Sequence, residues 1–280
     1  MNRHLIVSIT LALLYFSPPS SAQPAQSAQP AQSAPETVRI AVASNFKTTL
    51  EGLVVVWQNT QPEHHTTHIS ISSASTGILY NQITRGAPFD IFMSADEAHP
   101  VLLEDKFTPN KSDVYAIGRL VYWFPKQAQQ HPDLSTNNAK KRLKALILHQ
   151  NNQKMALANP KLAPYGNAAH TTLVKLALVD KLADKIVTGN NIAQVFQFVY
   201  SGAASSGFVA LSQIQQGSVD QQQWLEVPST EYNPIKQRMI LLNSSTRAKA
   251  VYRFLKSRES RQFIAKNGYA LPILKLESEN

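Results

Sequence analysis

The sequence predicts an α/β protein. Short apolar runs alternate along the chain with segments in which apolar residues recur at helical spacing. The first such pair is an apolar run over 38–43 followed by Leu50, Leu53, Val54 and Trp57 on one helical stripe. Alternating strands and helices favour parallel sheets covered by helices on both faces, with ligands at the carboxyl ends of the strands. We therefore expect a binding site at those ends.

The later elements follow the same alternation. Strands are predicted over 68–74, 89–95, 120–124, 154–158, 207–211 and 239–242. Helices are predicted over 77–84 and 167–182, in a stripe of Ile192, Val195, Phe196 and Val199, and in a long terminal helix over 247–266. Asp96 follows the third strand directly, where its carboxylate can cap the next helical turn.

Small polar clusters stand at four of the junctions from an apolar run into a helix. They are Ser44-Asn45, Ser75-Thr76-Gly77, Pro164-Tyr165-Gly166 and Asn190-Asn191-Ile192. A helix N-terminus has unpaired N–H groups and the positive end of the macrodipole, so several such ends facing one space form an anion site. Any one of Ser44, Thr76 and Asn191, taken alone, is more often a helix cap. Their recurrence at four junctions favours an oxyanion receptor.

The first 22 residues, 1–22, have the pattern of a secretory signal peptide. A basic start at Arg3 and His4 precedes an apolar run over 5–16 and a small-residue cleavage site at 20–22. This run is too short for a bilayer, and no later stretch reaches the roughly 20 apolar residues of a membrane helix. The chain has no Cys to carry a lipid anchor. We expect a soluble protein exported to the periplasm.

A spacer separates the signal peptide from the folded part. Residues 23–34 are the hexapeptide Gln-Pro-Ala-Gln-Ser-Ala written twice. Such sequence cannot bury enough apolar surface to fold, so 23–37 is predicted to be a disordered linker. The folded part, from Val38 to about Pro272, suits one large domain or two of about 100 to 120 residues each.

The basic charge favours an anionic partner. The formal net charge is +9, and loss of Arg3 with the signal peptide gives 9 − 1 = +8. Basic residues at 140–144 and 247–261 could serve nucleic acid, but they alternate with apolar residues at helical spacing, which is typical of the solvated face of an amphipathic helix. No recognition motif accompanies them. We expect no nucleic-acid partner.

Five motifs occur in order between Val38 and Pro272. They are Ile-Ala-Val-Ala-Ser-Asn-Phe at 40–46, Ser-Thr-Gly-Ile-Leu-Tyr-Asn-Gln-Ile at 75–83, Gly-Ala-Pro-Phe-Asp-Ile-Phe-Met-Ser-Ala-Asp at 86–96, Ala-Asn-Pro-Lys-Leu-Ala-Pro-Tyr-Gly at 158–166 and Gly-Phe-Val-Ala-Leu-Ser at 207–212. Together they closely resemble the molybdate-binding periplasmic proteins of ABC transporters.

The resemblance implies a type II periplasmic-binding-protein fold. In that fold two Rossmann-like α/β lobes, joined by a two-segment hinge, close over the ligand. Lobe I is expected to comprise 38–119 and 236–280, and lobe II 120–235. The chain is expected to cross between the lobes near 118–121 and to return near 233–237.

The resemblance also implies five ligand residues. Those with polar side chains are Ser44, a hydroxyl and backbone donor, Asn45, a donor in one branch of the family, and Thr76, a second hydroxyl donor. Tyr165 and Ile192 match residues that offer a backbone N–H at a helix start. Another branch has a Tyr at the position of Ala210, so here either Asn45 compensates or the site has one donor fewer.

The chemistry of the ligand agrees with this set. Molybdate and tungstate are tetrahedral dianions without a proton near neutral pH, so their site needs donors and no acceptors, which Ser, Thr, Asn and backbone N–H groups supply. We expect a monomeric, non-enzymatic receptor that passes molybdate or tungstate to an inner-membrane ABC permease and needs no cofactor. The alternatives are a sulfate-type oxyanion receptor and an exported sensory module with the same ligand.

Other chemistries have weaker support. A secreted hydrolase is disfavoured because the Gly-x-Ser-x-Gly elbow and a recognisable activating base are missing. His64, His65 and His68 lie close together but lack a fourth ligand, so no metal site is expected. Asp90 and Asp96 would lie about 20 Å apart along a strand, too far for shared acid–base work.

Overall fold

The computed structural model describes residues 37–60, 65–107, 111–125, 138–150 and 152–273. The predicted signal peptide and nearly all of the predicted linker lie outside these ranges, although Thr37, placed in the linker by the sequence, is the first residue of a strand. Within the described part of the chain, no helix combines the length and apolar character required to cross a bilayer.

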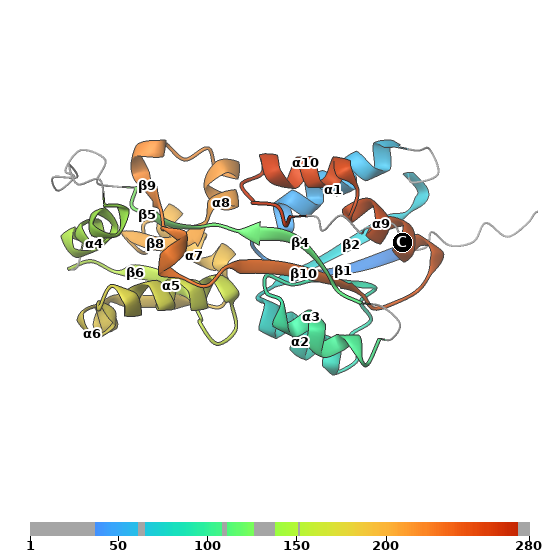
Figure 1. Ribbon diagram of the computed structural model, residues 1–280, viewed down its shortest axis with the longest axis horizontal. Helices are drawn as coiled ribbons and strands as arrows, with labels where there is room; N and C mark the ends of the chain where they lie inside the picture. The colour runs from blue at the N-terminus through green and yellow to red at the C-terminus, as the bar shows by residue number, and fades with distance from the viewer. Residues whose placement is uncertain (1–36, 61–64, 108–110, 126–137, 151, 274–280) are drawn as a thin grey trace, which may run out of the picture. The chain divides into compact units, whose positions relative to one another are not determined.

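The first of two five-stranded sheets has the order β2-β1-β3-β10-β4. Its central strand β1 (Thr37–Ala43) pairs in parallel with β2 (His68–Ala74) and with β3 (Ile91–Met93). Strand β10 (Ile235–Leu241) lies antiparallel between β3 and β4 (Asp113–Gly118) (Figure 1).

Helices cover both faces of this sheet because β1 is apolar on both. Val38, Ile40 and Val42 belong to one core, whereas Ala41 belongs to another, as the two-residue period of a strand requires. The first core also contains buried residues of α1 (Lys47–Thr60), α9 (Thr246–Leu255) and α10 (Arg258–Lys266). The second core contains buried residues of α2 (Thr76–Thr84) and α3 (Ala98–Glu104).

The second sheet has the order β7-β6-β8-β5-β9. Parallel pairs join β6 (Met155–Ala158) to β7 (Ile186–Gly189) and to β8 (Ser206–Ala210). Strand β5 (Leu120–Trp123) runs antiparallel to β8 and to β9 (Trp224–Glu226). Its helices are α4 (Ala139–His149), α5 (Pro164–Lys175), α6 (Val179–Leu182), α7 (Ile192–Tyr200) and α8 (Leu211–Gln216), with short 3-10 turns at Ala183–Lys185, Gln221–Gln223 and Ser229–Glu231.

The chain passes between the sheets twice. It first leaves the first sheet at Gly118, where β4 ends, and enters the second sheet at Leu120, where β5 begins. The chain returns between the end of β9 at Glu226 and the start of β10 at Ile235. The sheets are mixed: the pairs that the alternation predicts to be parallel are so, whereas β5 and β10, next to these crossings, run antiparallel to their neighbours.

Two predicted helices are each broken into two. The segment over 167–182 forms α5, which already begins at Pro164, and α6, with Ala177 between them at a φ of 52°. The terminal segment breaks at Ser257, whose hydroxyl accepts the N–H of Ser260 and so caps α10. Apolar periodicity continues across such breaks and does not reveal them.

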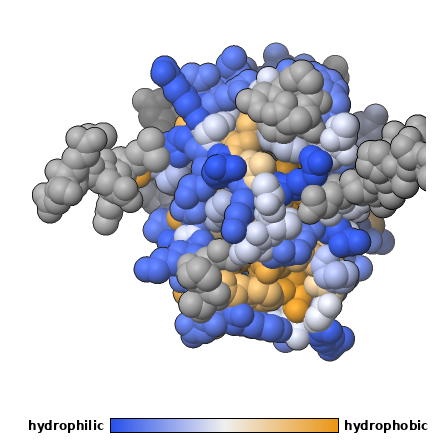
Figure 2. All heavy atoms as spheres, turned by 90° about the vertical axis from the view of Figure 1, so that its right-hand side faces the viewer, coloured by the Kyte–Doolittle hydropathy of each residue, from blue (hydrophilic) through white to orange (hydrophobic). Residues whose placement is uncertain are grey.

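The two basic segments form amphipathic helices, as the apolar spacing predicts. In α4, Leu143, Leu146 and Ile147 are buried, and in α9 so are Val251 and Leu255. The face of the molecule shown in Figure 2 is mostly hydrophilic, with a hydrophobic area toward its lower edge.

Candidate functional site

All five sequence-predicted ligand residues line one small pocket. It has about 190 Å³ of empty space, part of it open to solvent, and its lining is Ala43, Ser44, Asn45, Ser75, Thr76, Ala95, Ala163, Pro164, Tyr165 and Ile192. These residues follow the carboxyl ends of β1, β2, β3, β6 and β7, which is where α/β sheets bind ligands. We call Ser44, Asn45, Ser75 and Thr76 the first-sheet wall, and Pro164, Tyr165 and Ile192 the second-sheet wall.

Ser44 offers its hydroxyl to the pocket. Its backbone N–H, which the resemblance suggested as a further donor, donates instead to the carbonyl of Ala74 at 3.0 Å, extending the pairing of β1 with β2. Among the described residues, the hydroxyl of Ser44 has no hydrogen-bond partner. One donor of Ser44 is thus free.

Asn45 has its side chain committed elsewhere. Its amide Nδ2 donates to Gln237 Oε1 at 3.0 Å and to the hydroxyl of Tyr269 at 3.2 Å, which uses both amide hydrogens. The backbone carbonyl of Asn45 accepts a hydrogen bond from the hydroxyl of Tyr269 at 2.7 Å. Burial raises the pKa of Tyr269 to about 12. The backbone N–H of Asn45 makes no hydrogen bond within the described chain, so this group, not the amide side chain, is the donor available to the pocket.

Thr76 has its hydroxyl oriented by its neighbours. Oγ1 accepts the N–H of Ala95 at 2.9 Å, and the hydroxyl of Ser94 lies 3.4 Å away. A hydroxyl accepts two hydrogen bonds and donates one, so the proton of Thr76 is left for the pocket. Thr76 is fully buried, so the orientation of its hydroxyl is set by the surrounding protein.

Ser75 is a pocket donor that the sequence analysis did not assign. It occupies the N-cap position of α2, yet its side chain makes no capping bond, and its buried Oγ has no partner in the described structure. A buried hydroxyl without a partner is rare, and in the lining of this pocket it is a donor that a ligand can use. The sequence feature that could have identified Ser75 as a ligand residue is its position directly before Thr76 in the same polar cluster.

Tyr165 faces the pocket with its backbone. Its hydroxyl accepts from Gln237 Nε2 at 3.3 Å, and burial raises the pKa of this phenol well above its ordinary value. Helix α5 begins with Pro164, which lacks an N–H, so Tyr165 supplies the first N–H of the helix. Gly166 lets this end approach β6, because a Cβ there would lie 2.2 Å from the carbonyl oxygen of Ala158.

Ile192 begins α7 and is buried. The preceding Asn191 is an ordinary cap, because its side chain accepts the N–H of Gln194 at 3.0 Å. The capping interpretation is therefore correct for Asn191, while the N–H of Ile192 remains available. The N-termini of α2, α5 and α7 meet at this one pocket, so three helix dipoles favour an anion there.

Ala210 does not belong to the pocket lining. It is buried at the N-cap of α8, and its N–H donates to Gln213 Oε1 at 3.0 Å. The pocket thus lacks the tyrosine hydroxyl of the other branch, and the amide of Asn45 does not replace it.

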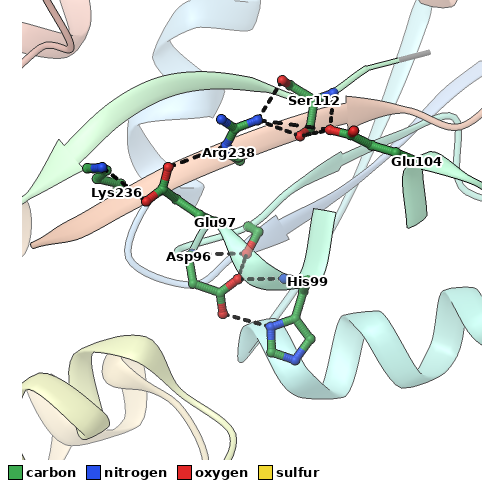
Figure 3. A network of polar contacts seen from close by, with 8 residues as sticks. Asp96, Glu97, His99, Glu104, Ser112, Lys236 and Arg238 are labelled. Atoms are coloured by element: carbon green, nitrogen blue, oxygen red, sulfur yellow. Dashed lines mark hydrogen bonds and ion pairs between the residues drawn. The ribbon is translucent and has the colours of Figure 1, made fainter. Parts of the chain in front are cut away.

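Charged side chains are missing from the described lining of the pocket. The nearby acid Asp96 accepts the N–H of His99 at 3.0 Å and contacts its Nδ1 at 2.7 Å, so it caps the turn as predicted (Figure 3). Glu97 lies between Lys236, at 3.2 Å, and Arg238, at 3.5 Å. The acids near the pocket are therefore paired outside it, and the pocket presents donors.

The other residues considered in the sequence, Asp90 and the three histidines, are not among the described residues that line the pocket. Asp90 accepts the N–H of Arg39 at 2.6 Å and the amide of Asn243 at 2.8 Å. Among the three histidines, His65 and His68 are exposed and His64 lies outside the described residues. No group of three metal-ligating side chains occurs in the described part of the chain.

Comparison with known proteins agrees with this architecture. The family described as bacterial extracellular solute-binding protein matches residues 38–270. The chain belongs to this family. It is thus a solute-binding protein and not an enzyme, with the two α/β lobes of the type II periplasmic-binding-protein fold.

Individual relatives carry more specific names. The chain is 36% identical over 234 residues to the molybdate-binding protein ModA of Rhodobacter capsulatus, covering 82% of this chain and 86% of that protein. It is 35% identical to ModA of Azotobacter vinelandii, covering 84% and 90%. The solved periplasmic molybdate-binding protein of Azotobacter vinelandii has a TM-score of 0.73 at 33% identity, covering 84% of this chain and all of that one. The sulfate-binding protein SubI of Mycobacterium tuberculosis, covering 84% and 87%, has a TM-score of 0.65 at 8% identity and shows the fold alone.

Proposed function

We propose that the protein captures molybdate in this pocket and delivers it to an inner-membrane ABC permease. Tungstate, with the same charge and shape, is expected to bind as well. The observation that carries the proposal is the uncharged pocket in which the hydroxyls of Ser44, Ser75 and Thr76 line the same space as the N-termini of α2, α5 and α7. The names of the relatives in Rhodobacter and Azotobacter support the choice of molybdate.

The donor set suits a dianion without a proton. Hydroxyls from the first-sheet wall and N–H groups of Asn45, Tyr165 and Ile192 give six donors from six residues. Hydrogen bonds to a charged acceptor are roughly twice as strong as neutral ones. We take the ligand set to be Ser44, Asn45, Ser75, Thr76, Tyr165 and Ile192.

The transport role sets the cellular context. We propose that residues 1–22 direct export to the periplasm, that 23–37 is a spacer, and that lobes 38–119 with 236–280 and 120–235 close over the ion. The receptor is expected to act as a monomer, since both walls of the pocket come from one chain.

Thermal unfolding with a panel of ions tests the function. A ligand at about 1,000 times its dissociation constant stabilises the folded state by roughly 4 kcal/mol. We expect micromolar molybdate and tungstate to raise the melting temperature. Absence of any shift at millimolar molybdate would remove the proposal.

Ser75→Ala tests the pocket itself. Deleting a hydroxyl that bonds a charged ligand costs about 1.5 to 3 kcal/mol, or around 10 to 150-fold in affinity. The free protein should be as stable as before or more so, because the variant removes an unpaired buried hydroxyl. Ser73→Ala, at an exposed position of β2, is the matched control. Unchanged affinity of Ser75→Ala in calorimetry would show that Ser75 does not touch the ion.

A further inference from the structure

Gln237 is a fully buried amide on β10, the strand by which the chain returns to the first sheet. Its Oε1 accepts from Asn45 Nδ2 and lies 3.0 Å from the hydroxyl of Tyr115 on β4. Its Nε2 donates to the hydroxyl of Tyr165 at 3.3 Å. One side chain therefore contacts three elements.

Two of these partners belong to opposite walls of the pocket. Asn45 is in the first-sheet wall and Tyr165 in the second-sheet wall, and each offers the pocket its backbone N–H. Gln237 itself does not line the pocket. The amide of Gln237 therefore connects, from outside the pocket lining, two residues whose backbone N–H groups are proposed to bind the same ion.

The local backbone is arranged around this contact. The pairing of β10 with β4 shifts register between Gln237 and Arg238, and such a bulge re-aims a side chain. At Gly118, the last residue of β4, a Cβ would lie 2.3 Å from the hydroxyl oxygen of Tyr165 and 2.9 Å from Gln237 Nε2. A glycine at this position leaves room for the phenol and the amide to meet.

We propose that Gln237 is a positioning residue that sets the spacing between the two walls, and through it the preference for molybdate over the smaller sulfate. The proposal rests on the proposed oxyanion-binding function. A pocket held at one spacing fits one size of tetrahedral ion best. Loosening the connection should lower the affinity for molybdate more than the affinity for sulfate, which already fits the pocket poorly.

Gln237→Met tests the proposal, because methionine keeps the length of the side chain and loses its hydrogen bonds. We expect molybdate affinity to fall and sulfate affinity to fall clearly less, because the lost hydrogen bonds hold Asn45 and Tyr165 at the spacing that the larger ion fits. The molybdate-to-sulfate affinity ratio, measured by calorimetry, should therefore fall several-fold. A purely structural role would lower stability and leave the ratio unchanged.

Gln216→Met is the matched control. Gln216 on α8 also joins the two halves, donating from Nε2 to Thr49 Oγ1 of α1 at 2.9 Å, but neither residue lines the pocket. The ratio should stay at its wild-type value in this variant. An equal change of ratio in Gln216→Met and Gln237→Met would overturn the proposal.

Tyr165→Phe keeps the test decisive if Gln237→Met does not fold. It removes the other end of the contact and should shift the ratio in the same direction by a smaller factor. An unchanged ratio in every variant of the two that folds, with wild-type protein binding molybdate, overturns the role of Gln237 alone. Wild-type protein that binds neither ion would instead refute the oxyanion-binding function.

Discussion

The two walls of the pocket bind with different parts of the chain. The first-sheet wall offers mainly side-chain hydroxyls, from Ser44, Ser75 and Thr76, with one backbone N–H from Asn45. The second-sheet wall offers backbone N–H groups at the starts of α5 and α7. A side-chain donor is lost by a point substitution, whereas a backbone donor survives almost any change except to proline. The first wall should therefore be sensitive to residue identity and the second to backbone chemistry.

The largest effect is expected for Thr76→Ala in the first-sheet wall. It deletes a donor to the ion, at about 1.5 to 3 kcal/mol, and leaves the buried N–H of Ala95 unpaired, at about 1 to 3 kcal/mol of stability. Calorimetry and denaturant unfolding should show both losses. Ser44→Ala, whose hydroxyl has no partner in the described structure, should lose affinity alone. Equal loss of stability in the two variants would contradict this difference.

A proline at position 192 tests the backbone donor of the second-sheet wall. Ile192→Pro removes the N–H at the first position of α7, where proline suits the helix, and also replaces a buried apolar side chain by a smaller ring. Asn191 already has an extended backbone (φ −155°, ψ 172°) compatible with a following proline. We expect about tenfold or greater loss of molybdate affinity. Ile192→Val, which keeps the N–H, should bind nearly as wild type. Equal affinity of the two variants would exclude Ile192 as a backbone donor.

The described lining of both walls has no carboxylate to accept a proton from the ligand, which predicts the response to phosphate. Near neutral pH phosphate keeps at least one proton, and leaving that O–H unpaired costs about 1 to 3 kcal/mol. In competition calorimetry at about pH 7.5, millimolar phosphate should fail to displace molybdate, while sulfate should compete weakly. Phosphate binding as tight as that of molybdate would mean that a carboxylate lines the pocket.

The smallest effect is expected for the phenol of Tyr165. Since the hydroxyl contacts Gln237 and not the pocket, Tyr165→Phe should cost under about 1 kcal/mol of molybdate affinity. A loss as large as that of Thr76→Ala in the same titration would show that the phenol reaches the ion. The assignment of the second-sheet wall as a backbone wall would then be wrong.

Sequence patterns identified the junctions at which the pocket is built. The donors at Ser44, Thr76, Tyr165 and Ile192 follow from a strand running into a helix, which is a local property readable from apolar periodicity and turn residues. The amphipathic character of α4 and α9 is local in the same sense. These predictions needed no knowledge of distant partners.

Tertiary structure alone decided which groups at those junctions remain free. Asn45 has the same donors as any asparagine, but its amide is taken by Gln237 and Tyr269, which lie 192 and 224 residues away in the chain. Ser75 is left unpartnered, although its position next to a helix suggests a cap. The antiparallel directions of β5 and β10 likewise follow from the crossings between sheets. A hydrogen bond is made by whichever group the folded chain brings within about 3 Å, and that proximity is set by the packing of the whole domain.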